Sequence, residues 1–332
     1  MNTNSVALPR IAVVIPCFRV ANQVVELIAR IGPEVGWIIV VDDACPEHSG
    51  EVVERSCSDP RVSVLYHAEN MGVGGAVMTG YAAALETGAR VVVKLDGDGQ
   101  MDPALIPALA RPLLKGVADY TKGNRFYRVR NAAGMPAMRL VGNVLLSFLT
   151  KMSSGYWQLF DPTNGFTAID RAVLAELERD RIAKRYFFES DLLYHLNQLR
   201  ATVVEVPMLA SYRDEPSSLR PARVLGPFLR GNLRNFARRV LYSYFLRGFS
   251  VASIELVIGS LLMAFGFVFG AIEWWHSVVE DVPATAGTVM LAALPLILGV
   301  QFVLSWLAFD VAAEPRIPVQ GLLRRQDPSS TE

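Results

Sequence analysis

The chain has 332 residues, 52% of them hydrophobic, and its 32 basic residues balance 32 acidic ones. This length suits one large α/β domain with an appendage, and a formal net charge of +0 argues against nucleic acid as a partner. The mean hydropathy of +0.29 is high for a soluble protein. Three cysteines cannot pair completely, which indicates reduced thiols in a cytosolic compartment.

Continuous apolar runs near the start of the chain predict strands that are buried on both faces. These runs cover residues 11–16, 37–42, 62–66 and 91–95, and a further strand is expected at 202–207. Segments with helical character lie between them at 20–31, 50–57 and 74–87. This alternation predicts an α/β fold with a mostly parallel, doubly wound sheet, in which ligands bind at the carboxyl ends of the strands.

The strongest chemical motif follows the run at 91–95 and reads Asp96-Gly97-Asp98-Gly99-Gln100. Two carboxylates separated by one residue in a glycine-containing turn can converge on one ion, and hard oxygen ligands suit Mg²⁺ or Mn²⁺. An EF-hand is excluded, because loop position 12 would be Pro107 instead of glutamate. A glycine-rich turn at 70–76 enters the next helix, where it could meet a phosphate or serve tight helix packing.

Residues 213–247 carry eight arginines interleaved with apolar side chains at nearly helical spacing. This pattern predicts an amphipathic helix on an anionic membrane surface, with a nucleic-acid-binding arm as the competing interpretation. The arginines are Arg213, Arg220, Arg223, Arg230, Arg234, Arg238, Arg239 and Arg247.

Two long apolar segments, at 251–272 and 288–309, predict transmembrane helices. The connection at 273–287 contains three acidic residues and no lysine or arginine, whereas arginines flank both segments. The positive-inside rule therefore places this loop outside, and the catalytic domain and both termini in the cytoplasm. Trp274 and Trp275 would lie in an interfacial aromatic belt.

Six motifs, in this order along the chain, resemble family 2 glycosyltransferases, in particular the polyprenyl-phosphate (dolichol-phosphate mannosyltransferase-like) subgroup. They are residues 14–18 (VIPCF), 41–44 (VDDA), 70–74 (NMGVG), 96–100 (DGDGQ), 122–126 (KGNRF) and 161–166 (DPTNGF). The resemblance covers roughly residues 10–245 and implies a GT-A-type, Rossmann-like catalytic domain. The first motif of the family usually continues with Asn-Glu, where this chain has Arg19 and Val20, and the Gln-x-x-Arg-Trp motif of processive synthases is absent from the sequence.

The resemblance also implies roles for individual residues. Pro16 and Asp43, with Asp96, would contact the nucleotide. A divalent metal, Mg²⁺ or Mn²⁺, would be held by Asp96, Asp98 and Gln100. The acceptor phosphate would be bound by Arg125, Arg139, Asn143 and Arg213, so that Asp98, Arg125 and Arg139 form the expected catalytic set.

The expected reaction is inverting, metal-dependent transfer of a hexose from a nucleotide sugar to a polyprenyl phosphate such as undecaprenyl phosphate. A UDP-sugar is favoured as donor, with a GDP-mannose-dependent mannosyltransferase as the alternative. A phosphate acceptor needs no general base, because it is already largely ionised near neutral pH. An alcohol acceptor would need one, and Glu189 or Asp191 would be the candidates. A sugar nucleotidyltransferase and a non-catalytic membrane scaffold are the rival classes.

The expected organisation has four parts. They are a cytoplasmic catalytic domain at 1–212, a basic juxtamembrane segment at 213–250, two transmembrane helices at 251–310 and a cytoplasmic tail at 311–332. The protein is expected in the inner membrane of the cell, as a homo-oligomer packed through its spans.

Overall fold

The computed structural model describes residues 10–127, 137–208 and 221–326 of the chain. The chain divides into two compact units. The first comprises Met1–Phe236 together with Pro315–Glu332, and the second is Ala237–Glu314. The segments on both sides of the second unit therefore belong to the same first unit.

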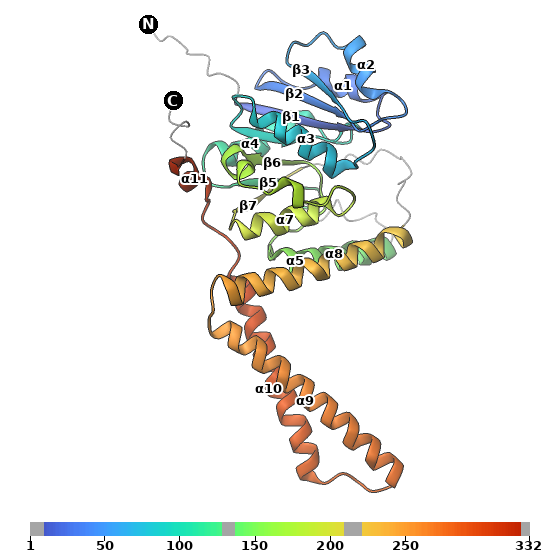
Figure 1. Cartoon of the computed structure of the whole chain (residues 1–332), viewed down its shortest axis with the longest axis vertical. Helices are drawn as coiled ribbons and strands as arrows, with labels where there is room; N and C mark the ends of the chain where they lie inside the picture. Colours follow the sequence, from blue (N-terminus) through green and yellow to red (C-terminus); the bar gives the residue numbers. More distant parts are fainter. Residues whose placement is uncertain (1–9, 128–136, 209–220, 327–332) are drawn as a thin grey trace. The chain divides into compact units, whose positions relative to one another are not determined.

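The first unit is built on a seven-stranded sheet with the order β3-β2-β1-β4-β6-β5-β7 (Figure 1). The strands are β1 (Ile11–Cys17), β2 (Val35–Asp42), β3 (Val62–Tyr66), β4 (Val91–Lys94), β5 (Tyr120–Asn124), β6 (Thr167–Asp170) and β7 (Val203–Pro207). Only β6 runs against its neighbours β4 and β5, and the other pairings are parallel. The mostly parallel sheet expected from the sequence is confirmed.

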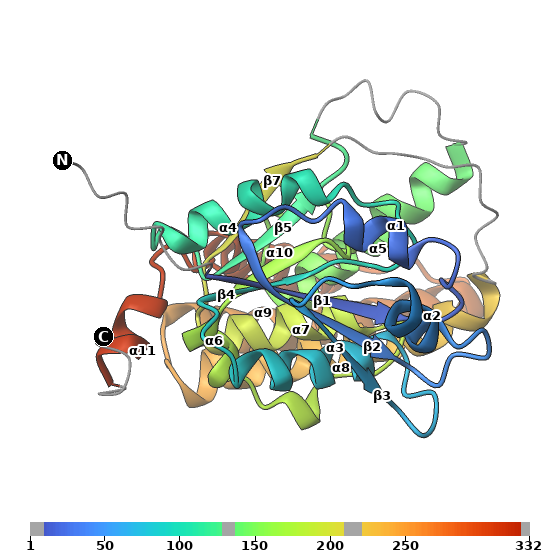
Figure 2. The same ribbon diagram turned by 90° about the horizontal axis from the view of Figure 1, so that it is seen from above.

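Helices cover both faces of this sheet (Figure 2). On one face, Val13 and Ile15 pack against α1 (Val24–Ala29), α2 (Ser49–Ser56) and α4 (Ile106–Leu114). On the other face, Ala12 and Val14 pack against α3 (Val73–Leu85), α6 (Arg171–Ala175) and α7 (Phe188–Gln198). Because alternate residues of β1 enter two separate cores, the strand reads as an uninterrupted apolar run.

Two further helices belong wholly or largely to the first unit: α5 (Ala137–Ser154) and α8 (Pro221–Leu241). The buried stripe of α8 contains polar residues, and Asn232 and Asn235 lie on it. Ser153 donates a hydrogen bond to Asn232, and Asn235 donates one to Asp191 of α7. Leu225, Leu229 and Leu233, on the other hand, form an exposed row one helical turn apart, so α8 leaves an apolar face uncovered.

The second unit contains α9 (Val251–Glu280) and α10 (Ala286–Ala312), which pack against each other. Gly259 and Gly299 allow this close approach, because a Cβ on Gly259 would lie 3.0 Å from the carbonyl oxygen of Gly299. Both helices are long and apolar enough to cross a membrane, with a mean hydropathy of 2.1. In the most apolar 18-residue stretch of each helix, only 22% of the α9 residues and 6% of the α10 residues are buried. Most of this apolar surface therefore faces outward.

The boundaries of the spans correct the sequence analysis. Residues 273–280, expected in an external loop, form the last two turns of α9, and the connection is reduced to residues 281–285. Trp274 and Trp275 therefore lie on a helix. The acidic residues in this stretch suggested a loop, but 30 helical residues exceed what ~30 Å of hydrocarbon needs, so the end of α9 can extend beyond it.

Arg239 was expected on the exposed, arginine-rich face of the amphipathic helix, and the structure shows it buried. It is buried within the second unit and forms a bidentate ion pair with Asp310, with Nη1–Oδ1 and Nη2–Oδ2 distances of 2.6 and 2.9 Å. The Tyr244 hydroxyl donates a third hydrogen bond to the same carboxylate. Arg230, Arg234 and Arg238 remain exposed as expected.

The C-terminal segment returns to the first unit and is fastened to it. Asp119, fully buried before β5, accepts hydrogen bonds from the backbone N–H groups of Val319 and Gln320 as well as from Thr202. Arg324 of α11 (Gln320–Gln326) forms an ion pair with the buried Asp170 at the end of β6. This segment lies at the sheet edge where β1 and β4 begin, opposite their carboxyl ends.

Replacing Asp119 by alanine is expected to destabilise the protein by about 3 kcal/mol, because three buried N–H groups would lose their acceptor. The midpoint of thermal unfolding of the full chain in detergent measures this loss. Glu51→Ala is the control, because Glu51 forms exposed ion pairs with Arg55 and His48, each worth about 0–1 kcal/mol. Equal midpoints for the two variants would show that the C-terminal segment contributes nothing to the stability of the sheet.

Candidate active site

A pocket of about 320 Å³ opens at the carboxyl ends of β1, β2 and β4. Its lining comes from the end of β1 and the residues just after it (Pro16, Cys17, Phe18 and Val20), from Asp43 after β2, from the turn into α3, and from Asp96 to Asp98 after β4. Arg185 and Tyr186 complete it. The structure thus brings together the residues expected at the nucleotide, Pro16, Asp43 and Asp96, although five separate segments supply the lining.

Asp43 organises the turn that precedes α3. Its Oδ1 accepts a hydrogen bond from the backbone N–H of Met71 and lies 2.7 Å from Nδ1 of His67, and its Oδ2 accepts from the N–H of Gly72. His67 also contacts Thr79 of α3 through Nε2. Both carboxylate oxygens of Asp43 therefore hold one wall of the pocket in place, while the residue itself stays nearly buried.

A buried lysine lies behind the first aspartate of the Asp96–Asp98 motif. The Nζ atom of Lys94 is 2.7 Å from Asp96 Oδ1 and 3.3 Å from Glu189 Oε1, and it donates a hydrogen bond to the carbonyl oxygen of Gly165. Burial alone would lower the pKa of Lys94, but the two carboxylates together outweigh it and raise the pKa above its usual value. Lys94 is therefore a permanent cation beside the pocket.

Asp96 and Asp98 have the chemistry for a divalent cation. Oδ1 of Asp96 faces the Lys94 ammonium, and Asp96 and Asp98 both line the pocket. The Oδ1 atom of Asp98 accepts a hydrogen bond from the N–H of Gln100. Within the described part of the chain, no three His, Cys, Asp or Glu side chains converge. Because Mg²⁺ commonly takes one or two carboxylates and completes its shell with phosphate oxygens and water, this pair fits an ion that arrives with a diphosphate. Gln100 lies in the exposed turn that follows.

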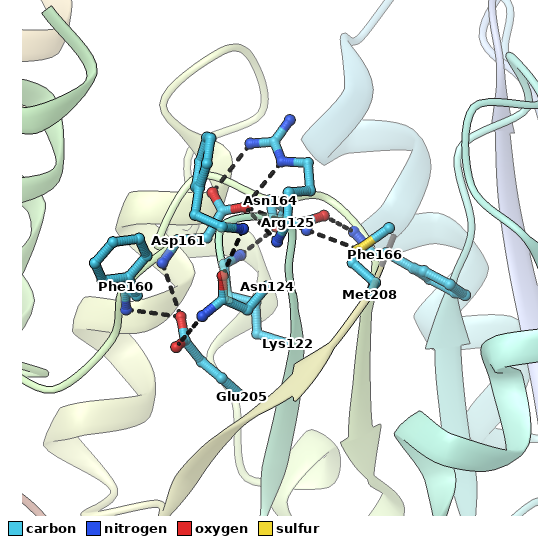
Figure 3. A network of polar contacts seen from close by, with 10 residues as sticks. Lys122, Asn124, Arg125, Phe160, Asp161, Asn164, Phe166, Glu205 and Met208 are labelled. Carbon is cyan, nitrogen blue, oxygen red and sulfur yellow. Dashed lines mark hydrogen bonds and ion pairs between the residues drawn. The ribbon is translucent and has the colours of Figure 1, made fainter. Parts of the chain in front are cut away.

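Arg125 follows β5 and is held by Asp161 (Figure 3). Its Nε and Nη2 atoms donate to the two oxygens of Asp161 at 2.8 and 3.0 Å, which fixes the plane of the guanidinium. Glu205 of β7 in turn accepts from the backbone N–H groups of Phe160 and Asp161 and from the Asn124 side chain. The Arg125 side chain remains 35% exposed. It is therefore partly accessible to a ligand, while buried polar contacts hold its guanidinium in place.

The other residues expected at the acceptor phosphate are only partly visible. Arg139 and Asn143 lie on α5, whose backbone is described there while their side chains are not. Arg213 lies outside the described residues.

The two candidate bases for an alcohol acceptor differ sharply in their surroundings. Asp191 is 1% exposed and accepts hydrogen bonds from the backbone of Ala183 and the side chain of Asn235, so it serves packing. Glu189, in the first turn of α7, reaches the Lys94–Asp96 pair. Only Glu189 belongs to the site.

A second buried lysine fastens the turn between Asp161 and Phe166. Lys122 donates a hydrogen bond to the carbonyl of Asn164, next to the Gly165 carbonyl that Lys94 binds. Burial lowers the pKa of Lys122 to about 8, because its attraction to Glu189 and Asp161 does not offset the loss of water. Two ammonium groups thus hold consecutive carbonyls of one turn.

The lowered pKa of Lys122 predicts a pH dependence of stability. Between pH 8 and the unfolded value of 10.5, the unfolded chain binds more protons than the folded one, so this group makes the protein more stable as pH rises, by at most about 1.4 kcal/mol per pH unit. In Lys122→Met the contribution disappears. The difference in unfolding midpoint between the two proteins should therefore shift in favour of wild type from pH 7.5 to 9.5. A difference that stays constant over this range would contradict the lowered pKa of Lys122.

A mostly parallel α/β sheet with an aspartate pair at its carboxyl edge is typical of the GT-A class of glycosyltransferases. The sequence matches the profile of Glycosyl transferase family 2 over residues 12–178, and the chain belongs to this family. It is therefore a glycosyltransferase, as the six motifs indicated.

The relatives and structures to which the chain is similar agree with this class. It is 30% identical to UDP-N-acetylglucosamine--dolichyl-phosphate N-acetylglucosaminyltransferase of Methanococcus voltae, over 53% of this chain and 75% of that one. It is 28% identical to undecaprenyl-phosphate mannosyltransferase of Micrococcus luteus, over 65% and 90% of the two chains. Glucosyl-3-phosphoglycerate synthase of Mycobacterium tuberculosis, solved with Mn²⁺, UDP and its product, shares the fold with a TM-score of 0.52 at 23% identity, over 70% and 80%.

Proposed function

We propose that this protein transfers a hexose from a nucleoside diphosphate sugar, with a UDP-sugar as the favoured donor, to a polyprenyl phosphate. The observation that carries the proposal is the aspartate pair Asp96 and Asp98 at the nucleotide-sized pocket, in a chain that also contains two helices long enough to cross a membrane. The relatives named above act on dolichyl or undecaprenyl phosphate, which supports the lipid acceptor. The relative with a named donor uses a UDP-sugar, whereas the name of the Micrococcus luteus relative supports mannose as the transferred sugar, which keeps GDP-mannose as the alternative donor.

The chemistry of the transfer follows from charge. A divalent ion, Mg²⁺ or Mn²⁺, bound by Asp96 and Asp98 would stabilise the negative charge that develops on the diphosphate leaving group. Pro16 and Asp43 would shape the pocket for the nucleoside. The acceptor phosphate is largely dianionic near neutral pH, so it needs orientation and no general base. Arg125, fixed by Asp161, would orient it together with Arg139, Asn143 and Arg213, and attack from the far side of the sugar gives inversion.

The membrane arrangement belongs to the same proposal. Both segments that flank the two long helices belong to one compact unit, which supports an arrangement in which the chain leaves and re-enters the membrane on the same side. The acidic connection between α9 and α10 would lie outside and the arginine-containing flanks in the cytoplasm. The exposed leucine row of α8, accompanied by Arg230 and Arg234, supports contact with an anionic inner leaflet. Association into a homo-oligomer through the spans stays a prediction.

A donor screen tests the proposal. The full chain in detergent would be mixed with Mn²⁺, a panel of UDP- and GDP-sugars, and undecaprenyl phosphate, with released nucleoside diphosphate as the readout. We expect one donor to turn over only when the lipid phosphate is present. Turnover that does not depend on the lipid phosphate would favour an alcohol acceptor, with Glu189 as the base. Release of pyrophosphate would indicate a nucleotidyltransferase. No turnover with any donor would favour a scaffold.

A further inference from the structure

Lys94 is a charged residue at a buried position of β4, where an apolar side chain is usual. It ends β4, whose three preceding residues, all valine, are fully buried, and Lys94 itself is only 1% exposed. An ammonium has three N–H donors. Three acceptors lie within 3.3 Å of Nζ: Asp96 Oδ1, Glu189 Oε1 and the carbonyl oxygen of Gly165. Every donor of the buried ammonium thus has a neighbouring oxygen.

The three oxygens come from three different parts of the fold. Asp96 follows β4, Glu189 belongs to the first turn of α7, and Gly165 lies in the turn before β6. The two carboxylates are largely buried, at 29% and 19% exposure, and they contact the same Nζ atom. Without the ammonium, two negative charges would repel each other in surroundings that screen poorly.

The surroundings leave little room for Asp96 to move. A Cβ on Gly165 would lie 2.5 Å from Asp96 Oδ2 and 2.7 Å from Lys94 Nζ, so the backbone of this turn presses against the ion pair. Asp96 also lines the pocket. Its orientation there is therefore set by a cation behind it and by a turn beside it.

We propose that Lys94 is a positioning residue, which pairs the pocket residue Asp96 with Glu189 and thereby sets the affinity for a metal-bound nucleoside diphosphate. The inference rests on the proposed function, since it assigns the pocket to a nucleotide. It differs from a purely structural role, because the loss of Lys94 should weaken nucleotide binding in protein that is still folded. Lys122 provides the matched comparison: it is an equally buried lysine on the neighbouring turn carbonyl, without an ion pair to a carboxylate among the described residues.

The test is isothermal titration of the full-length protein in detergent with UDP, and separately with GDP, in the presence of Mn²⁺. We expect Lys94→Met to raise the Kd of the nucleotide that wild type binds by about tenfold or more, because a charged contact to a binding residue is lost. Lys122→Met should stay within about threefold of wild type, since it leaves Asp96 and Glu189 paired with Lys94. A folded Lys94→Met protein that binds as wild type does would overturn the inference.

The Lys94→Met variant leaves two carboxylates without a cation, and it could fail to fold. The double variant Lys94→Met/Glu189→Gln removes one of these charges and should fold. Its Kd should exceed that of Glu189→Gln alone by the same factor of about ten. Equal affinities, or a double variant that still does not fold, would assign Lys94 to the core alone. If wild type binds neither UDP nor GDP, the proposed function fails first, and the two failures are distinguishable.

Discussion

Asp98→Asn is expected to lower turnover at least about 10³-fold, because the substitution removes the charge that holds the ion against the diphosphate. Asp98 lines the pocket beside Asp96, and the described residues offer no third carboxylate to replace it. The initial rate of nucleoside diphosphate release, with saturating donor and lipid phosphate, measures the effect. Unfolding midpoints of the two proteins should agree, since Asp98 is half-buried and lies in a turn.

Asp102→Asn is the matched control for this substitution. Asp102 lies four residues further along the same turn, forms an exposed ion pair with Arg30 and caps the short helical turn at 103–105. Its loss should change turnover by less than about threefold, because an exposed pair contributes little. If Asp98→Asn kept a tenth of the wild-type rate, the divalent ion would have to be held elsewhere.

Arg125→Ala is expected to reduce kcat/KM for the lipid phosphate about 10²-fold while the Kd of the nucleotide stays within about twofold. The two effects should differ because Arg125 follows β5 and is held by Asp161, whereas the nucleotide pocket lies at the ends of β1, β2 and β4. Arg125→Lys should recover only part of the loss, since an ammonium cannot reproduce the bidentate contact with Asp161. Steady-state kinetics with varied undecaprenyl phosphate, together with nucleotide titration, separates the two effects.

Arg55→Ala serves as the control for Arg125, because Arg55 is exposed on α2 and forms an exposed ion pair with Glu51. An Arg125→Ala protein that lost affinity for the nucleotide and the lipid equally would place Arg125 on the donor side. That result would leave the acceptor phosphate to Arg139, Asn143 and Arg213.

Much of the fold was predictable because the strands are buried on both faces. The runs at 11–16, 62–66 and 91–95 match β1, β3 and β4 to within one residue. Two strands, β5 and β6, were not predicted from the sequence. Their sequences, Tyr120–Asn124 and Thr167–Asp170, are short and rich in polar residues, which are buried by pairing across the sheet instead of by an apolar pattern. Periodicity carries no information on such tertiary pairing.

The candidate site, too, was predictable where it depends on strand ends and unpredictable where it depends on contacts between distant residues. The pair Asp96 and Asp98 could be placed at the sheet edge from sequence, because parallel strands end together. The network around Arg125 could not, since its partner Asp161 lies 36 residues away along the chain and Glu205, which binds the backbone of Asp161, lies 80 residues away. Lys94 was missed, because it was counted within the apolar run at 91–95; a lysine directly after three valines was the signal that could have found it. Asp43 was expected to touch the nucleoside, and its contacts with His67 and the turn into α3 add a role that only the structure reveals.

The most direct test of the central claim is the phosphorus NMR spectrum of the lipid recovered after reaction with the preferred donor. Transfer to a polyprenyl phosphate converts a monoester, whose second ionisation lies near pH 6, into a diester that has none. We therefore expect a lipid phosphorus signal whose shift does not change between pH 5 and 8, formed only with active enzyme. A lipid signal that still titrates, with the sugar recovered in the aqueous phase, would contradict transfer to the lipid phosphate.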